Sequence, residues 1–115
     1  MKNVAIIGAG LSGLFLANLL EKNKFYSYKI FEKKKALDLS DGYGIQLSAN
    51  SIYLLNKIGF QKMNATDVYF PKRVNFFDVR DQKKICDIDL SQFNYENVKY
   101  TTLKRGILVK FLLAN

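Results

Sequence analysis

The sequence predicts an α/β fold, and three features of the chain indicate it. The first is an apolar run at 4–7 that leads directly into glycines with the spacing GxGxxG and then into an apolar helical segment. The second is another short strand, at 28–31, that ends in Glu32. Strand, glycine turn, helix and strand in this order make the βαβ unit of Rossmann-like folds. The third is a later pair of short strands, which adds an antiparallel β-hairpin insertion.

The glycine turn has a physical role for each of its three glycines. Val4–Ile7 can form one buried parallel strand, and Gly8 permits the tight turn that leaves it. Gly10 lets a pyrophosphate approach the backbone, and Gly13 lets the following helix pack closely against the strand. The helix is expected at Leu11–Lys22, so the N–H groups of its first turn point towards the phosphates.

The second strand places an acid where a nucleotide-binding fold needs one. Tyr28–Phe31 is followed by Glu32, nineteen residues after Gly13. A carboxylate at this point accepts hydrogen bonds from the ribose diol of adenosine, whereas a 2′-phosphate would require an arginine. The alternative is a turn without a ligand and a surface glutamate. The sequence has the strand, the glycines, the helix and the acid in the order and spacing of the motif, which favours an ADP-binding βαβ unit.

The middle of the chain predicts an exposed loop, a turn and a second helix. The loop covers 33–43, including Ser40 and Asp41, and the segment Gly44–Leu47 leads into the helix. Ser48 is the expected N-cap of this helix. Gly59 is expected to end it in the left-handed conformation, with Phe60 as its apolar contact.

The last third predicts a hairpin and a final helix. Arg73–Val79 and Ile85–Leu90 flank a polar segment and alternate apolar with polar residues, which predicts a hairpin with one face in water. Cys86 is expected to be buried beside its isoleucine neighbours. Thr101 or Thr102 can cap a helix over 103–113.

Composition narrows the function classes. A chain of 115 residues that is 49% hydrophobic can build one small domain. It has one cysteine and no histidine, which excludes an internal disulfide and argues against a metal site. No apolar run reaches the length of a membrane span and no cleavable signal is present, so we expect a cytoplasmic protein without a transmembrane segment.

The net charge of +8 raises the question of nucleic-acid binding. Fifteen of the eighteen basic residues are lysines, and they are spread along the whole chain. Lysine, asparagine, isoleucine, phenylalanine and tyrosine are all used heavily, as an AT-rich coding sequence would produce. A solvated lysine-rich surface is therefore favoured, and we expect no nucleic-acid partner.

Three separated motifs together resemble the FAD-dependent aromatic-ring monooxygenases, the family of the para-hydroxybenzoate, salicylate and ubiquinone-biosynthesis hydroxylases. The first motif is the glycine turn of residues 8–14 with Glu32 and Lys33. The second is GYGIQLSANSIYLLNKIGF, residues 42–60, and the third is Arg105 in the helical pattern RxxLxxxL. The resemblance covers nearly all of the chain and is specific for the family, not for one member.

The resemblance implies a set of FAD contacts. The pyrophosphate would lie on the glycine turn, Glu32 would hold the adenosine ribose and Lys33 would lie beside the adenine. Gly44 would lie near the flavin, and Arg105 would reach the middle of the cofactor. The cofactor-binding set is therefore Gly8, Gly10, Leu11, Ser12, Gly13, Glu32, Lys33, Gly44 and Arg105.

The resemblance also implies a reaction and an incomplete domain. Family members hydroxylate a small aromatic or phenolic substrate with oxygen, using NAD(P)H as co-substrate. They carry two later cofactor motifs and a substrate domain beyond this length, so residues 1–115 correspond to the N-terminal part of an FAD-binding domain. The family also places an arginine before its second motif, where this chain has Asp38, Ser40 and Asp41. No catalytic residue is assigned.

Two other functions stay open at this point. The chain could be a stand-alone module that binds an ADP-containing nucleotide, or the product of a truncated, inactive open reading frame. If the domain is incomplete, the edge of the first strand and parts of two helices lack their cover. We then expect a completing C-terminal chain or self-association, and poor retention of flavin.

Overall fold

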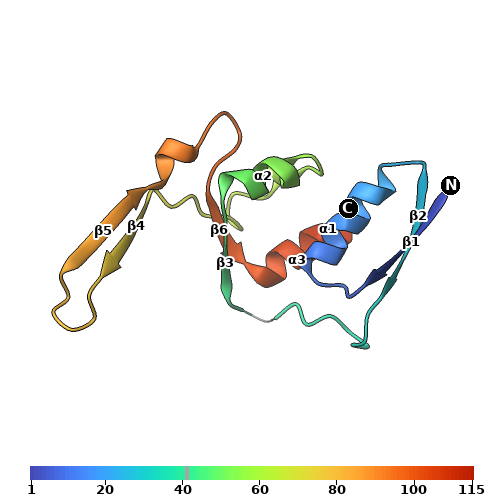
Figure 1. Ribbon diagram of the computed structural model, residues 1–115, viewed down its shortest axis with the longest axis horizontal. Helices are drawn as coiled ribbons and strands as arrows, with labels where there is room; N and C mark the ends of the chain where they lie inside the picture. The colour runs from blue at the N-terminus through green and yellow to red at the C-terminus, as the bar shows by residue number, and fades with distance from the viewer. Residues whose placement is uncertain (41) are drawn as a thin grey trace. The chain divides into compact units, whose positions relative to one another are not determined.

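The computed structural model describes residues 1–40 and 42–115, and so the expectations for Asp41 lie outside the described residues. The chain divides into two compact units (Figure 1). The first contains Met1–Ile45 and Leu103–Asn115, and the second contains residues 46–102.

The first unit begins with the predicted βαβ arrangement. Strand β1 (Lys2–Ile7) pairs in parallel with β2 (Tyr26–Phe31), and helix α1 (Leu11–Glu21) connects them. The register joins Val4 to Tyr28 and Ile7 to Phe31, so both strands end at the same edge. The predicted parallel pair is confirmed, with both strands starting two residues earlier than expected. The extra residues of β1, Lys2 and Asn3, are exposed, and those of β2, Tyr26 and Ser27, are half-buried.

Two of the glycines in the turn have the roles that the spacing predicted. Gly8 has φ +100°, a left-handed conformation that residues with a Cβ rarely adopt. A Cβ on Gly13 would lie 2.2 Å from the carbonyl oxygen of Gly8. Helix α1 can therefore pack this closely on the turn only because residue 13 has no side chain.

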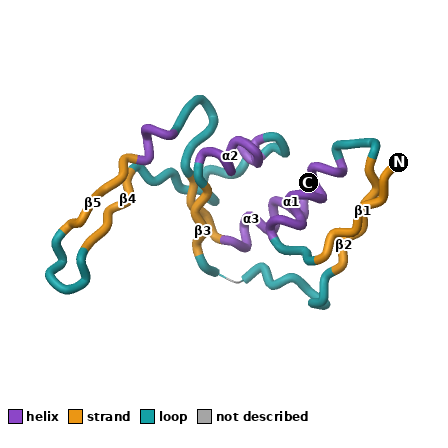
Figure 2. The backbone as a smooth tube through the Cα atoms, viewed as in Figure 1, coloured by secondary structure: helices purple, strands orange, loops and turns teal. Residues whose placement is uncertain are grey.

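Helix α3 (Arg105–Ala114) packs against α1 and completes the core of the first unit (Figure 2). A buried amide ties the two helices together: Asn18 Nδ2 donates to the carbonyl oxygens of Leu14 at 2.8 Å and Leu112 at 2.9 Å. Because these carbonyls belong to different helices, the amide fixes one against the other. The apolar core residues of this unit are Ile6, Ala9, Leu14, Ala17, Leu103, Leu108, Val109 and Leu112.

Two short strands correct the predicted turn and the predicted start of the last helix. Gly44–Leu47 is strand β3, not a turn, and it pairs with β6 (Thr101–Lys104). The last helix consequently begins at Arg105, and neither threonine caps it. The burial along β6 alternates, with Thr101 and Leu103 buried and their successors more exposed. This period of two is typical of a strand.

The second unit contains α2 (Ala49–Asn56), two 3₁₀ turns and the hairpin of β4 (Arg73–Phe77) with β5 (Lys84–Asp89). Ser48 is the N-cap residue of α2, as predicted, but its side chain makes no capping bond to the backbone. Gly59 has φ +94° and Phe60 is buried, and both were predicted. The turns are η1 (Phe60–Lys62) and η2 (Leu90–Phe93).

The antiparallel hairpin is confirmed, but the expectation that it has one wet face is wrong. Most residues of both strands are exposed, including Phe77 and Ile85. Cys86 is exposed too, which corrects its predicted burial. Within the second unit the hairpin extends away from α2 (Figure 1), so alternation along its strands has no core to face.

Across residues 1–40 and 42–115, none of the helices combines the length and the apolar character needed to cross a membrane.

We predict that Gly106→Ala destabilises the chain strongly. A Cβ at this buried position would lie 2.0 Å from the backbone oxygen of Leu39, and backbone moves less readily than a side-chain end. We expect a loss of about 1–3 kcal/mol in the free energy of unfolding, the usual cost of overpacking, measured by urea denaturation followed by circular dichroism. Gly44→Ala is the matched control, because nothing lies within 4 Å of its Cβ position. Equal stability of the two variants would show that the Leu39 loop does not pack on α3.

Candidate functional site

A cavity of about 300 Å³ lies in the first unit, at the edge where β1 and β2 end. The glycine turn, the end of β2, the loop that follows it and the first turns of α3 contribute its lining. Parallel sheets bind ligands at this carboxyl edge because the loops that leave the strands gather there. The lining residues are Ala9, Gly10, Glu32, Lys34, Leu37, Asp38, Tyr43, Arg105 and Val109.

Glu32 is held in this cavity by two backbone donors. The N–H of Ala9 donates to Oε2 at 2.8 Å, and the N–H of Lys34 donates to Oε1 at 3.0 Å. Each carboxylate oxygen has two lone-pair sites. One site on each oxygen is used by these bonds, so the carboxylate retains the capacity to accept hydrogen bonds from two vicinal hydroxyl groups.

The same contacts keep Glu32 ionised. The backbone N–H of Lys34 lowers the pKa of the Glu32 carboxyl below its ordinary value, and the N–H groups of Ala9 and Lys33 and the charge of Lys34 act in the same direction. Hydrogen bonds to the charged form favour that form. At neutral pH the group is therefore a carboxylate that only accepts hydrogen bonds.

Arg105 brings positive charge to the cavity from the start of α3. Its backbone N–H donates to the carbonyl oxygen of Tyr43 at 3.1 Å, and its guanidinium lies 6.0 Å from the centre of the Tyr43 ring. The backbone bond anchors the residue, and the ring contact gives the guanidinium a cation–π partner. Lys34 lines the same cavity. Two cations thus line the cavity together with the carboxylates of Glu32 and Asp38, and each cation can pair with a phosphate group.

A second carboxylate, that of Asp38, lines the same cavity as Lys34 and Arg105. Asp38 Oδ1 accepts hydrogen bonds from the Ser40 backbone N–H at 2.9 Å and from the Ser40 hydroxyl at 2.6 Å. The FAD-dependent monooxygenases that the sequence resembles carry an arginine in this part of the chain. An aspartate here reverses the sign of the charge at that position.

The glycine turn leaves open space beside the cavity. Gly10 has φ −75° and is the N-cap residue of α1, and a Cβ placed on it would meet nothing within 4 Å. Gly10 also lines the cavity, so the position that its Cβ would occupy is available to a ligand. A turn with this opening and with free helix N–H groups next to it suits a pyrophosphate.

The structure brings together three of the nine predicted cofactor residues on one cavity, namely Gly10, Glu32 and Arg105. Gly8, Leu11, Ser12 and Gly13 form the glycine turn and the first turn of α1 beside it. Lys33 and Gly44 are exposed and do not line this cavity.

Six residues of the cavity were not among the predicted cofactor residues: Ala9, Lys34, Leu37, Asp38, Tyr43 and Val109. Ala9 contributes through its backbone N–H, which any residue at that position would supply. Lys34 and Tyr43 lie in the loop after β2, whose path is not encoded in a short repeat. Tyr43 directly precedes Gly44, a predicted cofactor residue, and this neighbour in the sequence could have indicated that Tyr43 lies at the site.

The sequence matches no family profile and no curated protein sequence. Solved structures are similar in fold. HpxO of Klebsiella pneumoniae, complexed with FAD and uric acid, has a TM-score of 0.76 at 18% identity over 98% of this chain. The tetrameric form of 2-methyl-3-hydroxypyridine-5-carboxylic acid oxygenase has a TM-score of 0.79 at 19% identity over 99% of the chain. For 2,6-dihydroxypyridine-3-hydroxylase of Arthrobacter nicotinovorans the values are 0.67, 13% and 96%.

The chain spans only about a quarter of the length of these proteins, namely 28% of HpxO, 28% of the oxygenase and 25% of the dihydroxypyridine hydroxylase. The likeness confirms the α/β fold that the resemblance to FAD-dependent aromatic hydroxylases predicted.

We predict that Gly10→Ala weakens the binding of ADP without a large change in the free energy of unfolding. Its φ suits alanine and its Cβ meets no atom within 4 Å, so we expect the free energy of unfolding to change by less than about 1 kcal/mol. The new methyl group would occupy the space offered to a ligand, so binding of ADP, followed by isothermal titration calorimetry, should weaken. ADP affinity equal to that of the unchanged protein would exclude this turn as the phosphate site.

We also predict an acid-sensitive contribution from Glu32. Its pKa is lowered in the folded chain, so its stabilisation is present above the ordinary pKa of 4.5 and is lost as the pH falls below 4.5 through the folded value. Thermal unfolding of the unchanged protein and of Glu32→Gln should therefore differ most at neutral pH and converge in acid. A stability difference that grows as the pH falls would contradict this assignment.

Proposed function

We propose that the cavity beside the glycine turn binds FAD through its ADP half, and that the chain is the FAD-binding N-terminal segment of a flavin-dependent monooxygenase. The observation that carries the proposal is the fixed carboxylate of Glu32. It accepts the Ala9 N–H of the glycine turn and shares its cavity with Arg105. An acceptor for the ribose and a cation for the phosphates are thus present on one cavity.

Seven of the nine proposed cofactor residues lie on this cavity or in the glycine turn beside it. Glu32 accepts the ribose hydroxyl groups with its remaining lone pairs. The turn of Gly8, Gly10 and Gly13 receives the pyrophosphate, assisted by the N–H groups of Leu11 and Ser12 at the start of α1. Arg105 neutralises the phosphates from α3. Lys33 lies beside the adenine and Gly44 near the flavin, the two assignments that depend most on the path of the loop.

The proposed reaction is hydroxylation of a small aromatic or phenolic substrate with oxygen and NAD(P)H, in the cytoplasm. FAD, when bound, supplies the redox chemistry of such a reaction. The residues of this chain bind and orient the cofactor, and none of them is assigned as an acid, base or nucleophile. Because this chain spans only about a quarter of the length of the similar structures, the proposal assigns no substrate site to residues 1–115.

A narrower candidate is a module that binds an ADP-containing nucleotide without turnover. The observation in its favour is that the cavity is lined by residues of the first unit alone. The two candidates differ in a simple assay. Titration of the apoprotein with FAD and with ADP separates them: tighter binding of FAD than of ADP supports the flavin-binding segment, and equal affinities support the module.

We predict that Glu32→Ala weakens FAD binding roughly 5- to 150-fold, because hydrogen bonds to a charged acceptor are lost. Fluorescence titration of the apoprotein with FAD measures the dissociation constant. Glu21→Ala is the matched control, since Glu21 is an exposed acid of the same unit that accepts a hydrogen bond from the Tyr28 hydroxyl at 2.9 Å and does not line the cavity. If both variants bind FAD equally well, Glu32 does not hold the ribose.

A further inference from the structure

An open cavity of about 510 Å³ lies wholly in the second unit, beside the base of the β4–β5 hairpin. One wall is the segment 70–73, which leads into β4, and the others come from the end of β5, from η2 and from Lys99. Three of its lining residues, Lys72, Arg73 and Lys99, are cations, and one, Asp89, is an acid. We call it the basic cavity. It shares no lining residue with the cavity beside the glycine turn.

The acid of the basic cavity belongs to a network in which the charges balance. Arg73 Nη1 pairs with Asp87 at 2.8 Å, and Arg73 Nη2 lies 3.9 Å from an oxygen of Asp89. Lys84 Nζ pairs with Asp87 at 2.7 Å, and Asp89 also accepts the backbone N–H of Ser91 at 3.0 Å. Two cations thus offset two carboxylates. The network therefore adds no net charge to the basic cavity.

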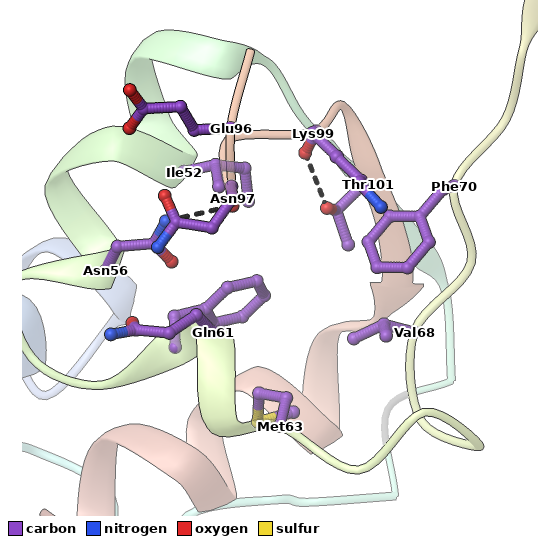
Figure 3. Close-up of a pocket in the computed structure, with 11 residues that line it drawn as sticks. Ile52, Asn56, Gln61, Met63, Val68, Phe70, Glu96, Asn97, Lys99 and Thr101 are labelled. Atoms are coloured by element: carbon purple, nitrogen blue, oxygen red, sulfur yellow. Dashed lines mark hydrogen bonds between the residues drawn. The ribbon is translucent and has the colours of Figure 1, made fainter. Parts of the chain in front are cut away.

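The other two cations of the cavity have no such partner. Neither Lys72 nor Lys99 makes an ion pair with a carboxylate in the part of the chain that the structure describes. The Lys99 ammonium lies 5.2 Å from the centre of the Phe70 ring. Figure 3 draws the neighbouring cavity that both residues also line, and it shows the Lys99 side chain directed towards this ring. The ring orients the ammonium without a neutralising charge, so two positive charges remain on the basic cavity.

Backbone hydrogen bonds fix the wall that carries Lys72. The Leu90 N–H donates to the carbonyl oxygen of Lys72 at 2.8 Å, which joins this wall to the start of η2. Just before the wall, Tyr69 and Thr102 exchange two backbone bonds, of 2.9 and 2.8 Å. The cavity is therefore formed without a ligand, which lowers the entropic cost of binding one.

Asn94 adds a neutral donor to the two lysines. Its Oδ1 accepts the backbone N–H of Tyr100 at 2.8 Å, and this bond decides the orientation of the amide. The Nδ2 group, which only donates, is consequently the end of the side chain that remains for a ligand. The cavity thus combines two cations with an amide donor, a set that suits an anion with several acceptor oxygens.

We propose that the basic cavity binds a small phosphate monoester, whose phosphate group is held by Lys72 and Lys99 with Asn94 Nδ2 as a further donor. A phosphate monoester carries about −1.5 to −2 charges at pH 7 and three acceptor oxygens, which match the two lysine charges and the amide. The volume exceeds that of a phosphate group, so the carbon part of the ester has room beside Phe70 and Pro71. The proposal does not depend on FAD binding, since it uses no residue of the first unit.

The test compares methyl phosphate with dimethyl phosphate, two esters of similar size. At about pH 8 the first is mainly a dianion, because its second pKa is about 6, whereas the second has a single charge. Amide shifts of the ¹⁵N-labelled 115-residue chain are followed during each titration at low ionic strength, since salt screens exposed charges. We expect saturable shifts at Lys72, Asn94 and Lys99, with methyl phosphate bound about fivefold more tightly.

Two results of these titrations would overturn the proposal. One is equal affinity for the two esters at the basic cavity, which would exclude recognition of the second phosphate charge. The other is the absence of saturable shifts at Lys72, Asn94 and Lys99. Shifts confined to Ala9 and Gly10 would be an instance of the second result, because they would assign the phosphate to the glycine turn and leave the proposed nucleotide site intact.

Three variants that each remove one positive charge complete the test. Lys72→Gln and Lys99→Gln should each weaken the binding of methyl phosphate about threefold and reduce its advantage over dimethyl phosphate. Lys83→Gln is the matched control, because Lys83 is an exposed lysine of the hairpin loop that does not line the cavity. All three side chains are exposed, and the same spectra report whether each variant is folded. Equal weakening by Lys83→Gln would show that only the overall charge of the chain attracts the ester, and would contradict the proposal.

Discussion

The candidate site depends on one hydrogen bond, from the Ala9 N–H to the carboxylate of Glu32. The parallel ladder of β1 and β2 ends with the Gly8 N–H, which donates to the Phe31 carbonyl oxygen at 2.7 Å. The next N–H along the chain has no backbone partner in the ladder, and the Glu32 side chain accepts it instead. This bond extends the pairing of the strands by one step into the glycine turn. It fixes the acid and the turn relative to each other before any ligand is bound, which lowers the entropic cost of binding.

Two close approaches of backbone to backbone position the rest of the cavity. Helix α1 lies on the glycine turn because Gly13 leaves room for the Gly8 carbonyl, and α3 lies on the loop after β2 because Gly106 leaves room for Leu39. The second contact is next to Arg105 in the sequence, so it sets the point from which the guanidinium reaches the cavity. The buried amide of Asn18 joins the two helices and makes their positions depend on each other.

Local patterns predicted the βαβ unit, α2, the left-handed Gly59 and the hairpin, because each of these is determined by residues close together in the chain. The pairing of β3 with β6 was missed, since it joins two four-residue segments that lie more than fifty residues apart. Cys86 was predicted to be buried because its neighbours are apolar. Burial also requires another element to cover the strand, and the alternation of apolar and polar residues does not show whether such an element is present. Gly10, Glu32 and Arg105, which the motifs predicted as cofactor residues, line one cavity, whereas the positions of Lys34 and Tyr43 depend on the path of a loop that no periodicity describes.

The Glu32–Ala9 contact and Arg105 are proposed to form one nucleotide site. The most direct measurement is a titration of the ¹⁵N-labelled chain with ADP, in which backbone amide shifts and the Arg105 Nε–H signal are followed together. We expect saturable shifts with a single dissociation constant at Ala9, Gly10, Lys34 and Arg105, residues that line one cavity. Shifts at Arg105 with a different constant from those at Ala9, or no shift in the glycine turn, would contradict this proposal.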